Sequence, residues 1–232
     1  MLRAWILVVA LAELVGFALP AVVGVLTAAS STAVALAALV VAGAVEGTVL
    51  GAGQVAVLRR ALPAVSVSRW VGATAGAAAL AYLLALLPSA AASVVAGWPV
   101  PVVVGVGAVL GVLVLLVIGA AQWLELRRHV VGAATWIGVT ALAWLLGLGV
   151  FLAAATPLWH PGQPLVVAVV IGLGAGALMA VAMAAVTGVG LVRLLARAGR
   201  DAGTVGVPFG PGGDGMPPRE SSGSPLREGE RS

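Results

Sequence analysis

Two glutamates, Glu13 and Glu46, are the residues best placed to do chemistry, because each lies inside a long apolar run. At ~1.5 Å per helical residue, counting from Arg3 and back from Arg59 puts them roughly 15 and 20 Å deep. A bilayer core about 30 Å thick would hold both near its middle. A carboxyl group at that depth is costly unless it is protonated, paired or hydrated. No basic residue occurs there, so the pattern indicates a proton or cation site, with two carboxyl groups sharing one proton.

A purely structural role for these glutamates stays open. A neutral glutamic acid can hydrogen-bond to Thr48, to a backbone carbonyl or to the other glutamate. Under either interpretation we expect both side chains to face the interior of a helical bundle, because a lipid-facing carboxyl group gains no partner.

The composition identifies the elements that must hold them as membrane helices. Hydrophobic residues make up 62% of the 232 residues and charged residues 9%, and the mean hydropathy is +1.17. Soluble domains are roughly 45–50% apolar and about 25% charged. The net charge of +4 comes from arginines that mostly flank apolar segments, so we expect a lipid bilayer as partner and no nucleic acid. The absence of cysteine excludes disulfides and thiolate chemistry.

Six apolar runs predict six transmembrane helices, near residues 4–27, 33–58, 70–87, 102–124, 133–155 and 165–195. The arginines fall on one side of this arrangement, which places both termini in the cytoplasm by the positive-inside rule. The use of arginine without lysine favours a bacterial plasma membrane. Tryptophans at the helix ends are typical of an aromatic belt in the interface: Trp5, Trp70, Trp123 and Trp136 at the cytoplasmic boundary, and Trp98 and Trp159 at the outer one.

An internal repeat divides these helices into pairs. The segment starting at Gly51 matches the segment starting at Gly119 at six of ten positions, ending in Leu-Arg-Arg in both. A Trp-x-Gly-x-Thr-Ala run follows each, and Trp5 and Gly188 give weaker copies. We therefore predict an all-α membrane protein of three tandem parallel helical hairpins, about 4–60, 69–128 and 135–197, within a domain at 1–200. The Gly- and Pro-rich residues 201–232 are expected to form a disordered cytoplasmic tail.

The motif Gly-x-x-Gln-(Trp)-x-x-Leu-Arg-Arg resembles a loose group of uncharacterised small multi-pass bacterial membrane proteins. In that group it lies near the cytoplasmic ends of alternate helices. The resemblance covers about residues 5–196 and departs from the pattern at Leu191, where a glutamine would be expected. It implies a fold type and no activity.

Small residues and glutamines repeat along the second helix of each predicted pair. Four-residue spacing keeps the small residues on one face, for packing within the chain or for a dimer interface. Gln54 and Gln122 lie about one turn inside the arginines, where they would orient a ligand or hydrogen-bond between helices. The glycines predicted to pack helices are Gly43, Gly47, Gly51, Gly107, Gly111, Gly119, Gly176 and Gly188.

The sequence favours a non-enzymatic protein. No catalytic, phosphate-binding or metal-binding motif is present, and His129 and His160 lie on opposite sides of the predicted membrane, so we expect no metal and no cofactor. Two functions remain. One is a small transporter or channel-like component with Glu13 and Glu46 as its polar site. The other is a membrane-embedded accessory or scaffold subunit, whose small-residue faces contact a second copy or another membrane protein.

Overall fold

Every element of the described chain is helical, and six of the helices are long and apolar enough to cross a membrane. The computed structural model describes residues 1–160 and 162–204. The helices are α1 (Leu2–Leu26), α2 (Thr32–Leu58), α3 (Val67–Ala90), the short α4 (Ala92–Val95), α5 (Val100–Leu126), α6 (Thr135–Ala155) and α7 (Leu165–Thr204).

The helix ends follow local chemistry and differ slightly from the expected boundaries. The Ser66 hydroxyl accepts a hydrogen bond from the Arg69 amide at 3.5 Å, so α3 begins earlier than the apolar run alone predicts. Gly132 takes a φ of +73° in the turn before α6, a conformation that glycine adopts without strain. Helix α7 continues to Thr204, into the start of the expected tail, and residues 205–232 lie outside the described residues.

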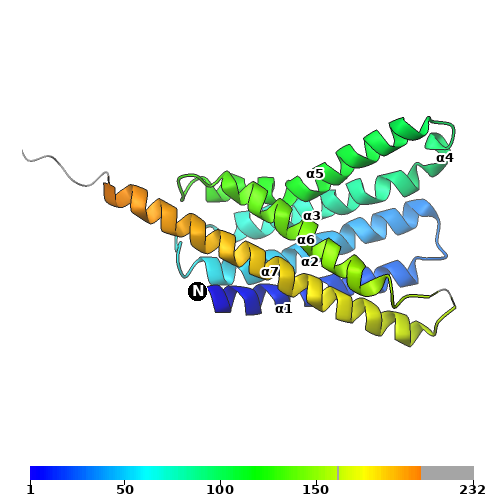
Figure 1. Cartoon of the computed structure of the whole chain (residues 1–232), viewed down its shortest axis with the longest axis horizontal. Helices are drawn as coiled ribbons and strands as arrows, with labels where there is room; N and C mark the ends of the chain where they lie inside the picture. The colour runs from blue at the N-terminus through cyan, green and yellow to red at the C-terminus, as the bar shows by residue number, and fades with distance from the viewer. Residues whose placement is uncertain (161, 205–232) are drawn as a thin grey trace, which may run out of the picture.

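The six long helices form a closed ring. Each packs against the long helix before and after it in the chain, and α7 returns to pack against α1. The chain start, the α2–α3 turn, the α5–α6 turn and the far end of α7 gather at one end of the bundle, on the left in Figure 1. We call this the arginine end, because Arg3, Arg59 and Arg127 lie there. Helices α5 and α6 diverge from it toward the opposite end (Figure 1).

Glycines on α2 allow its close contact with α3. A Cβ atom on Gly47 would lie 2.6 Å from the Cβ of Ala78, and one on Gly51 would lie 3.0 Å from the Cβ of Thr74. At Gly43 a Cβ would overlap the ring of Tyr82. The small-residue face of this helix therefore packs within the chain.

The other predicted packing glycines divide into two groups. Gly119 lies against α6, Gly188 against Trp5, and Gly176 against Phe17. Gly107 and Gly111 are exposed, and a Cβ on either would meet nothing within 4 Å. The prediction that these two glycines pack helices together within the chain is wrong, because this half of α5 diverges from α6 (Figure 1).

A buried carboxylate joins two turns at the arginine end. Glu125 is 3% exposed and accepts a hydrogen bond from the Ser66 amide at 2.9 Å, and its other contacts are His129 Nε2 at 3.1 Å, Arg69 at 3.7 Å and Arg128 at 3.8 Å. These contacts fasten the turn before α3 to the end of α5. Glu125 is not one of the residues that define a motif in the sequence.

The close α2–α3 contact leads to a stability prediction. Gly47→Ala should lower the free energy of unfolding by about 1–3 kcal/mol, because the added methyl group overpacks the contact with Ala78. Gly107→Ala is the matched control and should leave stability unchanged or slightly higher, since alanine is the better helix former. The measurement is the Tm of each purified variant in detergent. Equal destabilisation by both changes would contradict the packing described here.

Candidate functional site: a buried carboxyl pair beside a tryptophan cluster

Glu13 and Glu46 lie on neighbouring helices, α1 and α2, and both are buried, at 0% and 5% exposed. Their carboxyl groups are close enough to interact electrostatically. Gly16, one turn beyond Glu13, makes this approach possible: a Cβ there would lie 3.1 Å from the backbone oxygen of Glu46. The structure thus brings together the two residues that the sequence singles out.

The partners of the two carboxyl groups differ. Tyr82 on α3 donates its hydroxyl hydrogen to Glu46 Oε2 at 2.7 Å. The Glu13 carboxyl group lies against that of Glu46, and a hydrogen bond between the two requires that one of them is protonated. No other donor among the described residues reaches either Glu13 oxygen. Over residues 1–160 and 162–204, no ion pair involves either glutamate. Thr48, one of the partners considered from the sequence, donates instead to the Ala44 carbonyl of its own helix at 2.8 Å.

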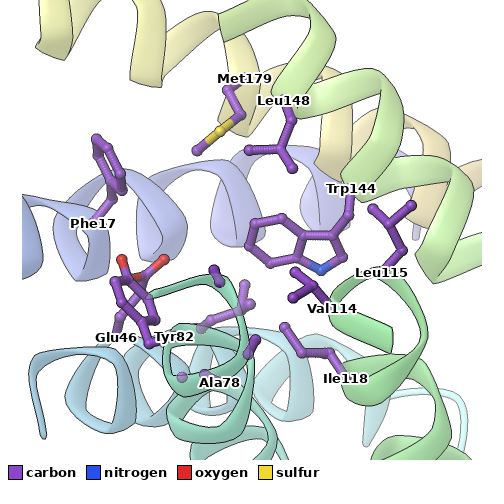
Figure 2. A pocket seen from close by; sticks show the side chains of 14 residues that line it. Phe17, Glu46, Ala78, Tyr82, Val114, Leu115, Ile118, Trp144, Leu148 and Met179 are labelled. Carbon is purple, nitrogen blue, oxygen red and sulfur yellow. The ribbon is translucent and has the colours of Figure 1, made fainter. Parts of the chain in front are cut away.

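The Glu46 side chain forms part of the wall of a central cavity of about 200 Å³. All six long helices contribute to the wall, and its surface is almost entirely apolar even with Glu46 included, because the carboxyl oxygens are nearly covered. Figure 2 shows Glu46 and Tyr82 together on one side of the cavity and Trp144 on the other. The lining residues are Phe17, Glu46, Gly47, Leu50, Ala78, Ala81, Tyr82, Ala85, Val114, Leu115, Ile118, Trp144, Leu148 and Met179.

A cluster of three buried tryptophans fills the bundle between this cavity and the arginine end. Trp5, Trp70 and Trp136 are each at most 1% exposed. The ring of Trp136 lies 6.1 Å from that of Trp5, edge to face, and 6.3 Å from that of Trp70. We call these three residues with their polar partners the tryptophan cluster.

The indole groups of the cluster donate to polar side chains on neighbouring helices. Trp70 Nε1 donates to Gln54 Oε1 at 3.2 Å, and Trp136 Nε1 donates to Gln122 Oε1 at 2.9 Å. The Gln122 amide also donates to Gln54 Oε1 at 2.7 Å and to the Thr74 hydroxyl at 3.0 Å. Both glutamines are therefore held in contacts between helices, one of the two roles considered for them.

The third tryptophan uses a partner that the sequence analysis missed. Trp5 Nε1 donates to the Thr187 hydroxyl at 3.0 Å, and that hydroxyl donates to the Met183 carbonyl at 2.9 Å. Thr187 lies one turn before Leu191, the position where the motif lacks its glutamine. A threonine one turn away on the same helix face was the available signal.

This cluster corrects the expected aromatic belt at the arginine end. Trp5, Trp70 and Trp136 belong to the core. Each indole N–H has a buried acceptor on a neighbouring helix, which removes the cost of taking the indole out of the interface. Trp123 is only partly buried, with the Arg127 guanidinium 4.8 Å from its ring centroid. Trp98 and Trp159 at the opposite end are exposed, as a belt requires.

The buried carboxyl pair could bind a proton or a cation. No group of three or more His, Asp or Glu side chains in the described ranges is placed to hold a metal ion. His129 contacts Glu125 at the arginine end, whereas His160 follows α6 at the other. Comparison of the chain with protein families, curated proteins and solved structures finds no match.

The tryptophan cluster yields a second prediction. Gln122→Leu removes the acceptor of the Trp136 indole and should destabilise the protein by about 1–3 kcal/mol, the cost of one buried unsatisfied donor. Gln163→Leu serves as the control, because Gln163 accepts only from the His160 amide in a turn. Thermal unfolding followed by tryptophan emission measures both. A Tm for Gln122→Leu equal to that of the control would rule out a stabilising role for the network.

Proposed function

We propose that this chain is a small transporter-type membrane protein in which Glu13 and Glu46 form a proton- or cation-binding site. The observation that carries the proposal is the burial of two carboxyl groups together, beside a cavity and without a cationic partner in the described chain. A bundle that needed only stability would gain from apolar residues at these positions. Ionisable residues inside membrane segments are expensive and typically mark ion or proton pathways.

The surroundings of the site favour a transporter over an open channel. The tryptophan cluster fills the bundle on the arginine side of the cavity, and the cavity wall is apolar. On the other side, Leu148 lines the cavity and is 39% exposed, so the proposal places exchange with the outside at that half of the bundle. Release toward the arginine end requires the three tryptophans to separate, and their hydrogen bonds are the element that such a transition must break.

Orientation and repeat structure belong to the same proposal. The arginines at one end support a plasma-membrane protein with both termini in the cytoplasm, of the kind that the motif resemblance implies. The three tryptophan bonds support three tandem hairpins. Each runs from the start of one helix to the preceding helix in the ring, to the last turns of α2 and α5 from α3 and α6, and to the middle of α7 from α1.

One observation favours a second candidate, the accessory or scaffold subunit. The half of α5 farthest from the arginine end is exposed on all sides, and Gly107 and Gly111 lie there without neighbours. Closely spaced glycines on an exposed membrane helix permit close approach of another helix. In this alternative a second copy or another membrane protein covers α5, and the glutamates are neutral structural groups.

The carboxyl site is tested in proteoliposomes that contain a pH-sensitive dye. With a proton gradient applied, the wild-type protein should shift the internal pH, and Glu13→Gln and Glu46→Gln should reduce the flux to that of protein-free liposomes. Both variants should still fold, because glutamine is neutral and similar in size, whereas Glu46→Lys should not fold, since it places a charge in the bundle.

The control for this experiment is Thr48→Ala, which changes a polar residue on the same helix whose hydroxyl bonds only within that helix. It should retain wild-type flux. Wild-type flux in a correctly folded Glu13→Gln, Glu46→Gln double variant would refute the transport role of the pair and leave the accessory-subunit alternative.

That alternative makes its own prediction. The chain has no cysteine, so Gly107→Cys introduces a single thiol on the exposed face of α5. If a second copy covers this face, mild oxidation in native membranes should give a disulfide-linked dimer. Val41→Cys on α2, a position that is 65% exposed, provides the comparison site on another helix. A dimer from neither site, or equally from both, would contradict a specific contact through α5.

A further inference from the structure

The central cavity has the size of a small organic molecule. Its volume is about 200 Å³, whereas a cavity of about 150 Å³ in another protein binds benzene. A molecule with one aromatic ring and a small substituent group therefore fits. A second hollow, of about 580 Å³, lies between α1, α6 and α7, but every residue that lines it is apolar, so it offers nothing to recognise a polar group.

The central cavity has one carboxyl group in its wall and aromatic side chains around it. Glu46 is the only acidic or basic residue in its lining, with the carboxyl group almost covered, and Glu13 interacts with it from α1. Trp144 lies across the cavity, and Phe17, four residues after Glu13, lines it from α1 (Figure 2). Carboxylates and aromatic faces both attract ammonium groups, and the attraction is stronger when water is excluded.

The chemistry of the wall discriminates between kinds of cation. A metal ion such as Ca²⁺ takes six to eight oxygen ligands, and among the described residues that line this cavity only Glu46 and Tyr82 carry a side-chain oxygen. An organic ammonium ion loses its water more cheaply and has apolar surface to bury against the remaining wall.

We propose that the cavity binds a lipophilic organic cation, about one aromatic ring bearing a substituted ammonium group, in exchange for a proton of the Glu13–Glu46 pair. This deepens the proposed function and rests on it. The cation binds when one carboxyl group releases its proton to water, so the buried charge stays balanced. The titratable neighbours of Glu46 on the two helices packed against α2 are Glu13 and Tyr82.

Such a ligand reaches the cavity from the bilayer. Val114 and Leu115 of α5 and Leu148 of α6 line the cavity where these helices begin to diverge, and Leu148 is 39% exposed. A lipophilic cation accumulates near the membrane interface because its apolar part partitions and its charge stays hydrated. Entry between α5 and α6 then needs no aqueous path.

The test compares two isosteric probes on the full-length protein in nanodiscs. Benzyltrimethylammonium carries the positive charge, and neopentylbenzene replaces its nitrogen with carbon. Titration calorimetry, with protein-free nanodiscs as blank, should show saturable binding of the cation only. In weakly buffered solution each bound cation should release up to one proton to a pH indicator.

Three variants locate the site. Glu46→Gln should abolish both binding and proton release, and Trp144→Leu should weaken binding while leaving the proton-release stoichiometry of the bound fraction unchanged. Should Glu46→Gln fail to fold, Val114→Phe gives the second route, because it fills the cavity without touching a carboxyl group. The control is Leu7→Phe, an exposed position on α1 outside the cavity.

Each result decides the matter. Equal binding of both probes, or cation binding that survives Glu46→Gln and Val114→Phe, would overturn the inference and leave an unspecific apolar cavity. No cation binding alongside carboxyl-dependent proton flux in proteoliposomes would overturn the inference alone and keep the proposed function. Loss of that flux in the wild type as well would refute both.

Discussion

The constraint on which this structure depends is that a polar group in hydrocarbon must find its partner within the chain. Helices meet the constraint for the backbone, and that is why six apolar runs become six helices. For side chains the ring provides an interior to which all six helices contribute. The buried indole N–H groups of Trp5, Trp70 and Trp136 each meet an acceptor there. Two buried groups within the long helices depart from this pattern among the described residues: the Thr140 hydroxyl has no partner, and the Glu13 carboxyl group has only the carboxyl group of Glu46.

The same constraint separates the bundle into two levels with different properties. Near the arginine end, large side chains and hydrogen bonds link neighbouring helices, and Glu125 fastens two turns outside them. At the level of the cavity, the bond between Tyr82 and Glu46 is the one side-chain hydrogen bond between lining residues in the described chain, and small residues such as Ala78 and Ala81 leave space. A rigid level beside a loosely filled one is what a binding site within a bundle requires.

The helices and the buried glutamates were predictable from the sequence. The hydrogen-bond partners of the tryptophans and the packing neighbours of the glycines were not. Hydropathy predicts the six helices, and the depth of Glu13 and Glu46 predicts that both side chains face the interior of the bundle. Both signals can be read from short stretches of sequence. The tryptophans were assigned to the interface, since helix-end position cannot distinguish a lipid-facing indole from one that faces Gln54 or Gln122. Gly47 and Gly107 have the same local spacing, yet only Gly47 has a helix against it. That difference arises from the divergence of α5 and α6, a tertiary property with no local signal.

The predicted repeat gives a reason for the asymmetry of the cavity. Matching the three hairpins by their tryptophans puts Ala78 and Trp144 at the position of Glu13, and matching them by their glycines puts Val114 at the position of Glu46. Ala78, Val114 and Trp144 all line the cavity with Glu46. Glu13 and Met183, which matches Glu46 in the third hairpin, do not line it. The four matched positions in the wall carry a carboxyl group from the first hairpin, alanine and valine from the second and an indole from the third. A carboxyl group at the same position in all three hairpins would place like charges close together, and these charges would repel one another. Different side chains in the three hairpins instead leave Glu46 on one side of the cavity and Trp144 on the other, so a ligand of the proposed kind would contact both in one orientation.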